Sequence, residues 1–137
     1  MKEFRNPENV HAPVGFYMHQ AELTGNERLL VISGQVGRKQ DGTTPEDPLE
    51  QLDVIFENLR ENLEAADMEM SDIVKLNYYL VGEWDLAARR ELVMKKLGDH
   101  KPCSTLVFVV GLAAPEFKVE VEALASRSGW AVDSDES

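Results

Sequence analysis

Residues 47–82 read DPLEQLDVIFENLRENLEAADMEMSDIVKLNYYLVG, and they predict a helix followed by a strand. Its first part has apolar residues at helical spacing, which predicts an amphipathic helix from Pro48 to about Ala66. Asp47 suits the N-cap of that helix, and proline is favoured at the first helical position. The second part, residues 72–82, alternates apolar and polar side chains, which predicts a strand with one covered face. The apolar stripe of the predicted helix consists of Leu52, Ile55, Phe56, Leu59 and Leu63.

The flanking segments extend this pattern on both sides. Residues 15–23 and 28–36 predict two strands, joined as a hairpin because Gly25 and Asn26 tolerate the backbone of a tight turn. A second helix is predicted over residues 83–98, and two more strands over the ranges 104–112 and 118–126. The segment 104–112 is apolar on both faces, as is typical of a central strand.

The resulting order, ββαβαββ, predicts an α+β domain in which two helices cover one face of a sheet. The other sheet face then needs a cover of its own. In so short a chain, another copy of the chain is the natural candidate. The pattern therefore predicts an oligomer, without fixing the number of subunits.

Length and composition indicate one globular domain. The chain has 137 residues, of which 43% are hydrophobic and 28% charged. We expect the domain to span residues 1–128 and the acidic segment 129–137 to be a disordered tail. No apolar run approaches the ~18 residues of a membrane span, and the N-terminus lacks the apolar core of a secretory signal. The single cysteine, Cys103, fits a reducing cytoplasm.

The charge of the chain bears on its partners. The formal net charge is −11, and no cluster of lysines and arginines stands out in the sequence. Nucleic-acid backbones are polyanions that bind to basic surfaces. The composition therefore argues against a nucleic-acid partner.

Four segments in this order and spacing resemble one family. They read ISGQV (32–36), EQLDVIFENLRENLEAADMEMSDIVKLNYYL (50–80), KPCSTLVFV (101–109) and KVEVEALA (118–125). Together they resemble the RidA/YjgF family of enamine and imine deaminases over roughly residues 12–126. The resemblance implies a chorismate-mutase-like fold with one mixed sheet, a homotrimer, and small-molecule clefts between neighbouring subunits. It also implies hydrolysis of reactive enamines or imines to ammonia and a 2-keto acid, without a cofactor.

The resemblance also assigns residues to the cleft. Glu120 matches the family glutamate that positions or activates water, and is the expected catalytic residue. Tyr17, Gly34 and Leu106 match positions that line the ligand. Ser104 stands where the family has an arginine that grips the substrate carboxylate.

Serine at position 104 can form a hydrogen bond but carries no charge. Without a charge-assisted bidentate contact, a carboxylate is held less firmly. Three basic residues are candidates to replace the missing cation, namely Arg38, Arg90 and Lys101. Otherwise the ligand is neutral, or is an acid held by backbone groups. The sequence therefore leaves a hydrolase and a non-catalytic binding or regulatory module both open.

Each candidate also has a plainer interpretation. Glu120 and Glu122 fit a solvent-facing pair on an edge strand, and Tyr17 fits a packing role. Cys103 fits a small structural residue better than a nucleophile. His11, His19 and His100 lack metal-ligand spacing, so no metal site is expected.

Overall fold

The computed structural model describes residues 1–129, so the predicted acidic tail lies outside the described residues except for Gly129. In chain order the elements are β1 (Lys2–Arg5), β2 (Gln20–Leu23), β3 (Glu27–Val36), α1 (Pro48–Ala65), the 3-10 turn η1 (Met70–Asp72), β4 (Ile73–Leu80), α2 (Leu86–Leu97), β5 (Cys103–Phe108) and β6 (Val119–Ser128).

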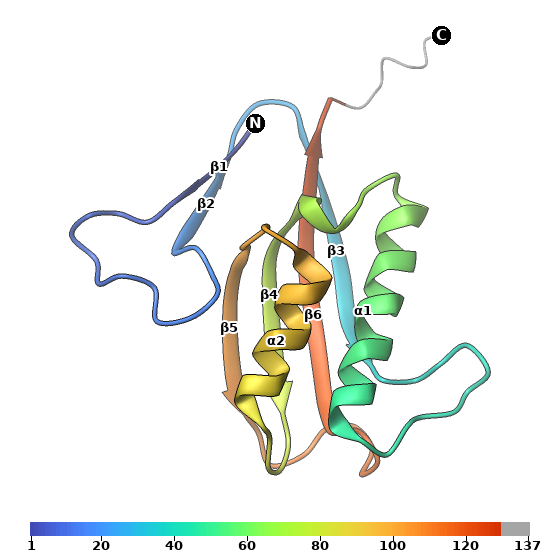
Figure 1. Cartoon of the computed structure of the whole chain (residues 1–137). Coiled ribbons are helices and arrows are strands. Elements are labelled where there is room, and N and C mark those ends of the chain that lie inside the picture. The colour runs from blue at the N-terminus through green and yellow to red at the C-terminus, as the bar shows by residue number, and fades with distance from the viewer. Residues whose placement is uncertain (130–137) are drawn as a thin grey trace, which may run out of the picture.

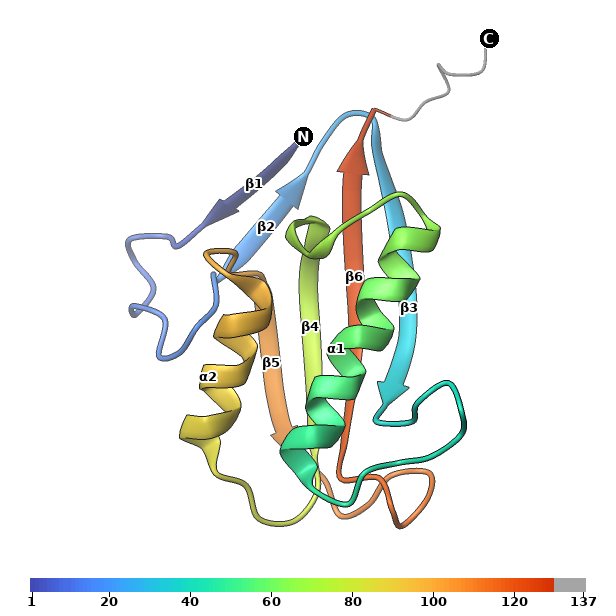
Figure 2. The same cartoon turned by 45° about the vertical axis from the view of Figure 1, so that its right-hand side comes forward.

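Four strands form a mixed sheet in the order β3-β6-β4-β5. Strand β6 is antiparallel to both of its neighbours, and β4 is parallel to β5. Both helices lie on the same face of this sheet, as Figures 1 and 2 show. The predicted α+β class, with a mixed sheet and two helices, is confirmed.

The core lies between the helices and the sheet. The stripe predicted for α1 is fully buried against alternate residues of β4 and β6. Asp47 caps α1 by accepting a hydrogen bond from the Glu50 N–H at 3.0 Å. Helix α2 starts at Leu86, later than predicted, because Asp85 is its N-cap. It ends at Leu97 and is followed by the C-cap residue Gly98, whose φ of 65° favours glycine.

The predicted hairpin between residues 15–23 and 28–36 is wrong. Of residues 15–23 only Gln20–Leu23 is a strand, and it pairs with β1, which was not predicted from the sequence, in a separate two-stranded sheet. The second predicted strand is present as β3 but pairs with β6. The segment before β2 is irregular because its backbone N–H groups bond elsewhere. Met18 N–H donates to the Pro102 carbonyl at 3.4 Å, and His19 N–H donates to the Asn6 side chain at 2.8 Å.

The predicted central position of the segment 104–112 is also wrong. Strand β5 lies at the edge of the four-stranded sheet, and β6 occupies a central position between β3 and β4. The apolar side chains of the β5 segment are in part exposed, Val107 and Phe108 among them. Their apolar character therefore does not come from burial within this chain.

The sheet face opposite the helices is not covered by the described residues of the chain. On it, Val31 retains 69% of its accessible surface and Leu29 retains 57%. None of the helices in residues 1–129 is long and apolar enough to cross a membrane.

Candidate functional site

Glu120 and Gly34 lie together on the open face of the sheet. Val119 and Val121 point into the core, so strand alternation directs Glu120 to the opposite face. A Cβ atom built on Gly34 would lie only 1.9 Å from Oε2 of Glu120. Glycine at position 34 therefore makes the space that the Glu120 carboxylate occupies.

The neighbouring carboxylate, Glu122, is hydrogen-bonded to two side chains of β4. It accepts hydrogen bonds from the Tyr79 hydroxyl at 2.6 Å and from Nδ2 of Asn77 at 3.1 Å. The bond to Glu122 raises the pKa of Tyr79. Among residues 1–129, the side chain of Glu120 forms no hydrogen bond or ion pair. Because β6 is central, the interpretation of Glu120 and Glu122 as an edge-strand pair does not hold.

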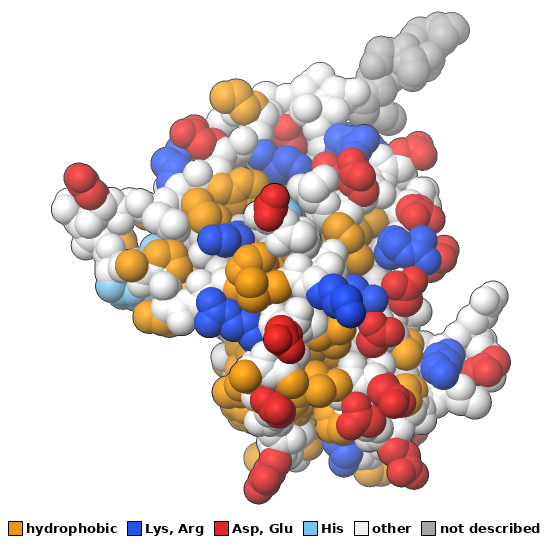
Figure 3. Space-filling model, in the orientation of Figure 1, with side chains coloured by type: hydrophobic (Ala, Val, Ile, Leu, Met, Phe, Trp, Pro, Cys, Tyr) orange, Lys and Arg blue, Asp and Glu red, His pale blue; other side chains and the backbone are white. Residues whose placement is uncertain are grey.

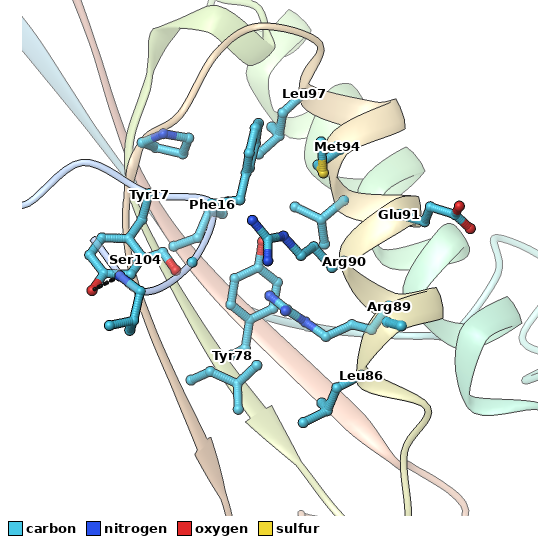
Figure 4. A pocket seen from close by; sticks show the side chains of 17 residues that line it. Phe16, Tyr17, Tyr78, Leu86, Arg89, Arg90, Glu91, Met94, Leu97 and Ser104 are labelled. Atoms are coloured by element: carbon cyan, nitrogen blue, oxygen red, sulfur yellow. Dashed lines mark hydrogen bonds between the residues drawn. The ribbon is translucent and has the colours of Figure 1, made fainter. Parts of the chain in front are cut away.

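Tyr17, Ser104 and Leu106 line a cavity on the other side of the sheet. The cavity has a volume of about 520 Å³ and lies between residues 14–17, strand β5 and helix α2 (Figure 4). Ser104 and Leu106 pair in register with the buried Leu76 and Tyr78, so their side chains face the helices. Within one chain, the five predicted site residues therefore form two groups that lie on opposite faces of the sheet.

Tyr17 is held in place at the mouth of this cavity. Its hydroxyl accepts a hydrogen bond from the Val14 N–H at 3.2 Å, which leaves the hydroxyl proton free to donate. Its ring meets the His19 ring edge-on, with 5.6 Å between the centroids. The Tyr17 side chain therefore combines a packed ring with a hydroxyl available to a ligand.

The three candidate cations differ in their position relative to this cavity. Arg90 lines the cavity that Ser104 and Tyr17 share. Lys101 lies at its margin, with Nζ 5.6 Å from the centre of the Phe16 ring. Arg38 is not among the residues that line the cavity; it is exposed in the loop after β3, where its guanidinium lies beside Gly42.

A fourth cation, Arg89, was not predicted from the sequence. It also lines the cavity, and its guanidinium carbon lies 4.5 Å from the centre of the Tyr78 ring. Burial lowers the pKa of Arg89 and raises the pKa of Tyr78 to about 12. The spacing from Leu86 was the available signal, since positions three and four residues along a helix share a face.

Cys103 does not line this cavity. Strand alternation places Cys103 on the sheet face opposite Ser104, and burial raises the pKa of its thiol, which disfavours the nucleophilic thiolate. Within residues 1–129 there is no group of three or more histidine, cysteine or acidic side chains that could hold a metal ion.

A second and larger groove, of about 980 Å³, lies between α1 and α2. Apolar side chains gather between the helices in the space-filling view, while charged ones crowd over α1 (Figure 3). None of the predicted site residues lines this groove.

Comparison with known proteins decides the family. The model of the family described as Endoribonuclease L-PSP matches residues 9–127. The chain belongs to the RidA/YjgF family. A RutC family protein of Pyrococcus horikoshii is 33% identical over 129 residues, which cover 93% of this chain and 99% of the relative.

Two further members of the RidA/YjgF family are informative. The crystal structure of YyfB from Yersinia pestis has 31% sequence identity and a TM-score of 0.79, covering 90% of this chain and 97% of YyfB. The Escherichia coli protein named "Putative reactive intermediate deaminase TdcF" is 26% identical, covering 93% of this chain and 99% of TdcF. A TdcF structure with bound serine has a TM-score of 0.67, covering 92% of this chain and 99% of that one.

Proposed function

We propose that this RidA-family protein hydrolyses reactive imines or enamines, or a related metabolite, in clefts between the subunits of a homotrimer. Glu120 acts on the attacking water, and Tyr17, Gly34, Ser104 and Leu106 line the ligand. The observation that carries the proposal is the free carboxylate of Glu120, seated in the space left by Gly34 on an uncovered sheet face.

The separation of the five site residues supports assembly. Glu120 and Gly34 lie on the open face, whereas Ser104 and Leu106 face the helix side of the edge strand β5. A cleft that holds all of them requires the β5 edge of one subunit beside the open face of another. The exposed Leu29 and Val31 on that face are suited to burial against a second copy.

Hydrolysis of an imine needs a water molecule and a side chain that accepts and returns a proton. Water adds to the imine carbon, so that a C–O bond forms as Glu120 accepts a proton from the water. Glu120 passes this proton to the nitrogen, which gives a carbinolamine. The hydroxyl of the carbinolamine then gives up its proton to the nitrogen as the C–N bond breaks, so that ammonia leaves and a carbonyl product remains. The amino-acid ligand in the TdcF structure supports a substrate of amino-acid size.

The test is ammonia release from a panel of imines generated in situ from amino acids. We expect wild-type protein to exceed the uncatalysed rate on at least one imine and Glu120→Gln to lose about 100-fold or more of that excess. The matched control is Glu122→Gln, on the same strand and face, in which an amide oxygen still accepts from Tyr79 and Asn77. Wild-type rates equal to the uncatalysed rate on every imine would refute the proposal.

The second candidate is a non-catalytic trimeric module that senses a metabolite or regulates a partner enzyme. The neutral Ser104, in place of the family arginine, favours it. A ligand that raises the melting temperature and is never converted would support this role over hydrolysis.

The acidic charge of the chain supports neither RNA binding nor ribonuclease activity, despite the description of the family model. Absence of RNA binding at all salt concentrations would agree with this, and tight, salt-dependent binding would contradict it. A cytoplasmic location remains a prediction from the single cysteine.

A further inference from the structure

Two arginine side chains of α2 enter the cavity whose opposite wall carries Ser104. Figure 4 shows Arg89 and Arg90 both extending from the helix toward Tyr78, while the carboxylate of Glu91 points away. Within residues 1–129, neither arginine forms an ion pair with a carboxylate. Arg89 lies against Tyr78, which is neutral at pH 7, and the other charge that acts on Arg89 is that of Arg90, which has the same sign.

This arrangement is costly in the absence of an anion. Nε of Arg89 is buried and lacks a hydrogen-bond partner. A guanidinium keeps its charge in proteins, so its desolvation is offset by contacts with opposite charge, with acceptors or with an aromatic face. The Tyr78 ring gives Arg89 such a face but leaves the positive charge of the pair without a counter-ion. The chain has 25 acidic residues against 14 lysines and arginines, yet none of those described neutralises this pair. Two like charges beside one another therefore favour an anionic ligand.

We propose that Arg89 and Arg90 bind the carboxylate of the ligand, replacing from helix α2 the cation that position 104 lacks. This inference rests on the proposed function, because it uses the same cleft. The two guanidinium groups give the planar, paired donors that a carboxylate accepts. The hydroxyls of Ser104 and Tyr17, which line the same cavity, are neutral donors for the polar atoms next to the carboxylate.

The rest of the cavity defines the ligand class. Its volume of about 520 Å³ is in the range of small-metabolite sites. The remaining wall is largely apolar, which fits a monocarboxylate with an apolar tail better than a strongly hydrated phosphate. The apolar side chains of this wall include Phe16, Leu86, Val93, Met94 and Leu97.

The test measures binding rather than turnover, with 2-oxohexanoate as the probe in calorimetric titrations of the full chain. We expect the affinity for 2-oxohexanoate to fall at least about 10-fold in Arg90→Gln and further in the Arg89→Gln/Arg90→Gln double variant. The methyl ester of the probe should bind wild-type protein at least about 10-fold more weakly than the acid. Arg60→Gln, which removes a charge from the exposed side of α1, should leave the affinity unchanged.

Several results would overturn the inference. They are no binding of 2-oxohexanoate by wild-type protein, equal binding of acid and ester, tighter binding of inorganic phosphate, or unchanged affinity in both arginine variants. Arg90 is exposed, so its single variant keeps the test valid even where the double variant is unstable. Arginine-dependent binding without imine turnover would refute the proposed hydrolase activity and support the inference. Imine turnover together with unchanged ligand affinity in the arginine variants would keep the hydrolase proposal and refute the inference.

Discussion

At the scale of the residue, the site depends on the side chain that Gly34 lacks and on the charge that Ser104 lacks. Gly34 has no side chain, and that absence gives the Glu120 carboxylate its place. Ser104 has no charge, and the cavity it lines instead receives two arginines from α2. The sequence identified both positions through the family resemblance, but it did not show that Arg89 and Arg90 face Ser104.

Gly34→Ala tests the first of these points. The new Cβ would lie within 1.9 Å of Glu120 Oε2, so the flexible end of the glutamate must move while the backbone stays. We expect imine turnover to fall by about 100-fold, as for a misplaced catalytic group, with the free energy of unfolding changed by less than about 1 kcal/mol. Kinetic assays and urea unfolding provide the measurements. Gly111→Ala, with no atom within 4 Å of its new Cβ, should change neither quantity.

At the scale of the element, the small β1–β2 sheet is tied to the main sheet by charge. Asp72, at the end of η1, contacts Lys2 Nζ at 3.3 Å and accepts from Arg127 Nε at 3.0 Å. These contacts join β1, η1 and β6. They were not predictable from the sequence, because their partners are 70 and 55 residues from Asp72 along the chain.

Asp72→Asn should weaken this link and lower the free energy of unfolding at pH 7 by about 2 kcal/mol. Burial acts to raise the pKa of Asp72, but the Glu69 N–H, Arg127 and Lys2 outweigh it, so the pKa of the folded protein is lowered. Because the folded pKa lies below the unfolded value of about 3.9, the stabilisation is complete above about pH 4 and is lost as the pH falls through the folded pKa.

Urea unfolding from pH 7 down to about pH 3 measures this dependence for wild type and variant. The difference between the two proteins should shrink only at the acid end. A difference that stays constant over the whole range would show that the carboxylate charge is not responsible. Asp99→Asn, at an exposed position, provides the control.

At the scale of the whole molecule, the sheet has one covered and one open face. The helices bury the core side, while Leu29 and Val31 remain exposed on the other. The edge strand β5 adds Val107 and Phe108 to the exposed apolar surface. Such a surface is typical of a subunit interface.

Val31→Asp should therefore disrupt the proposed trimer, since a carboxylate in an apolar interface loses its hydration without gaining a partner. Light scattering coupled to size-exclusion chromatography should give a trimer mass for wild type and smaller species for the variant. Circular dichroism should show that the fold persists. Asn62→Asp adds the same charge to the exposed side of α1 and should remain trimeric. A monomeric wild-type protein would contradict both the assembly and the shared cleft.

The sequence alone determined the helices, the class of the fold and the family, because these depend on local patterns such as the stripe of α1 and the alternation in β4 and β6. The tertiary structure decided that β2 pairs with β1, that β6 rather than β5 is central, and that Arg89 and Arg90 lie opposite Ser104. Periodicity records which side of an element is buried. It does not record which element lies beside it, because strand order and side-chain juxtaposition arise from contacts between residues far apart in the chain.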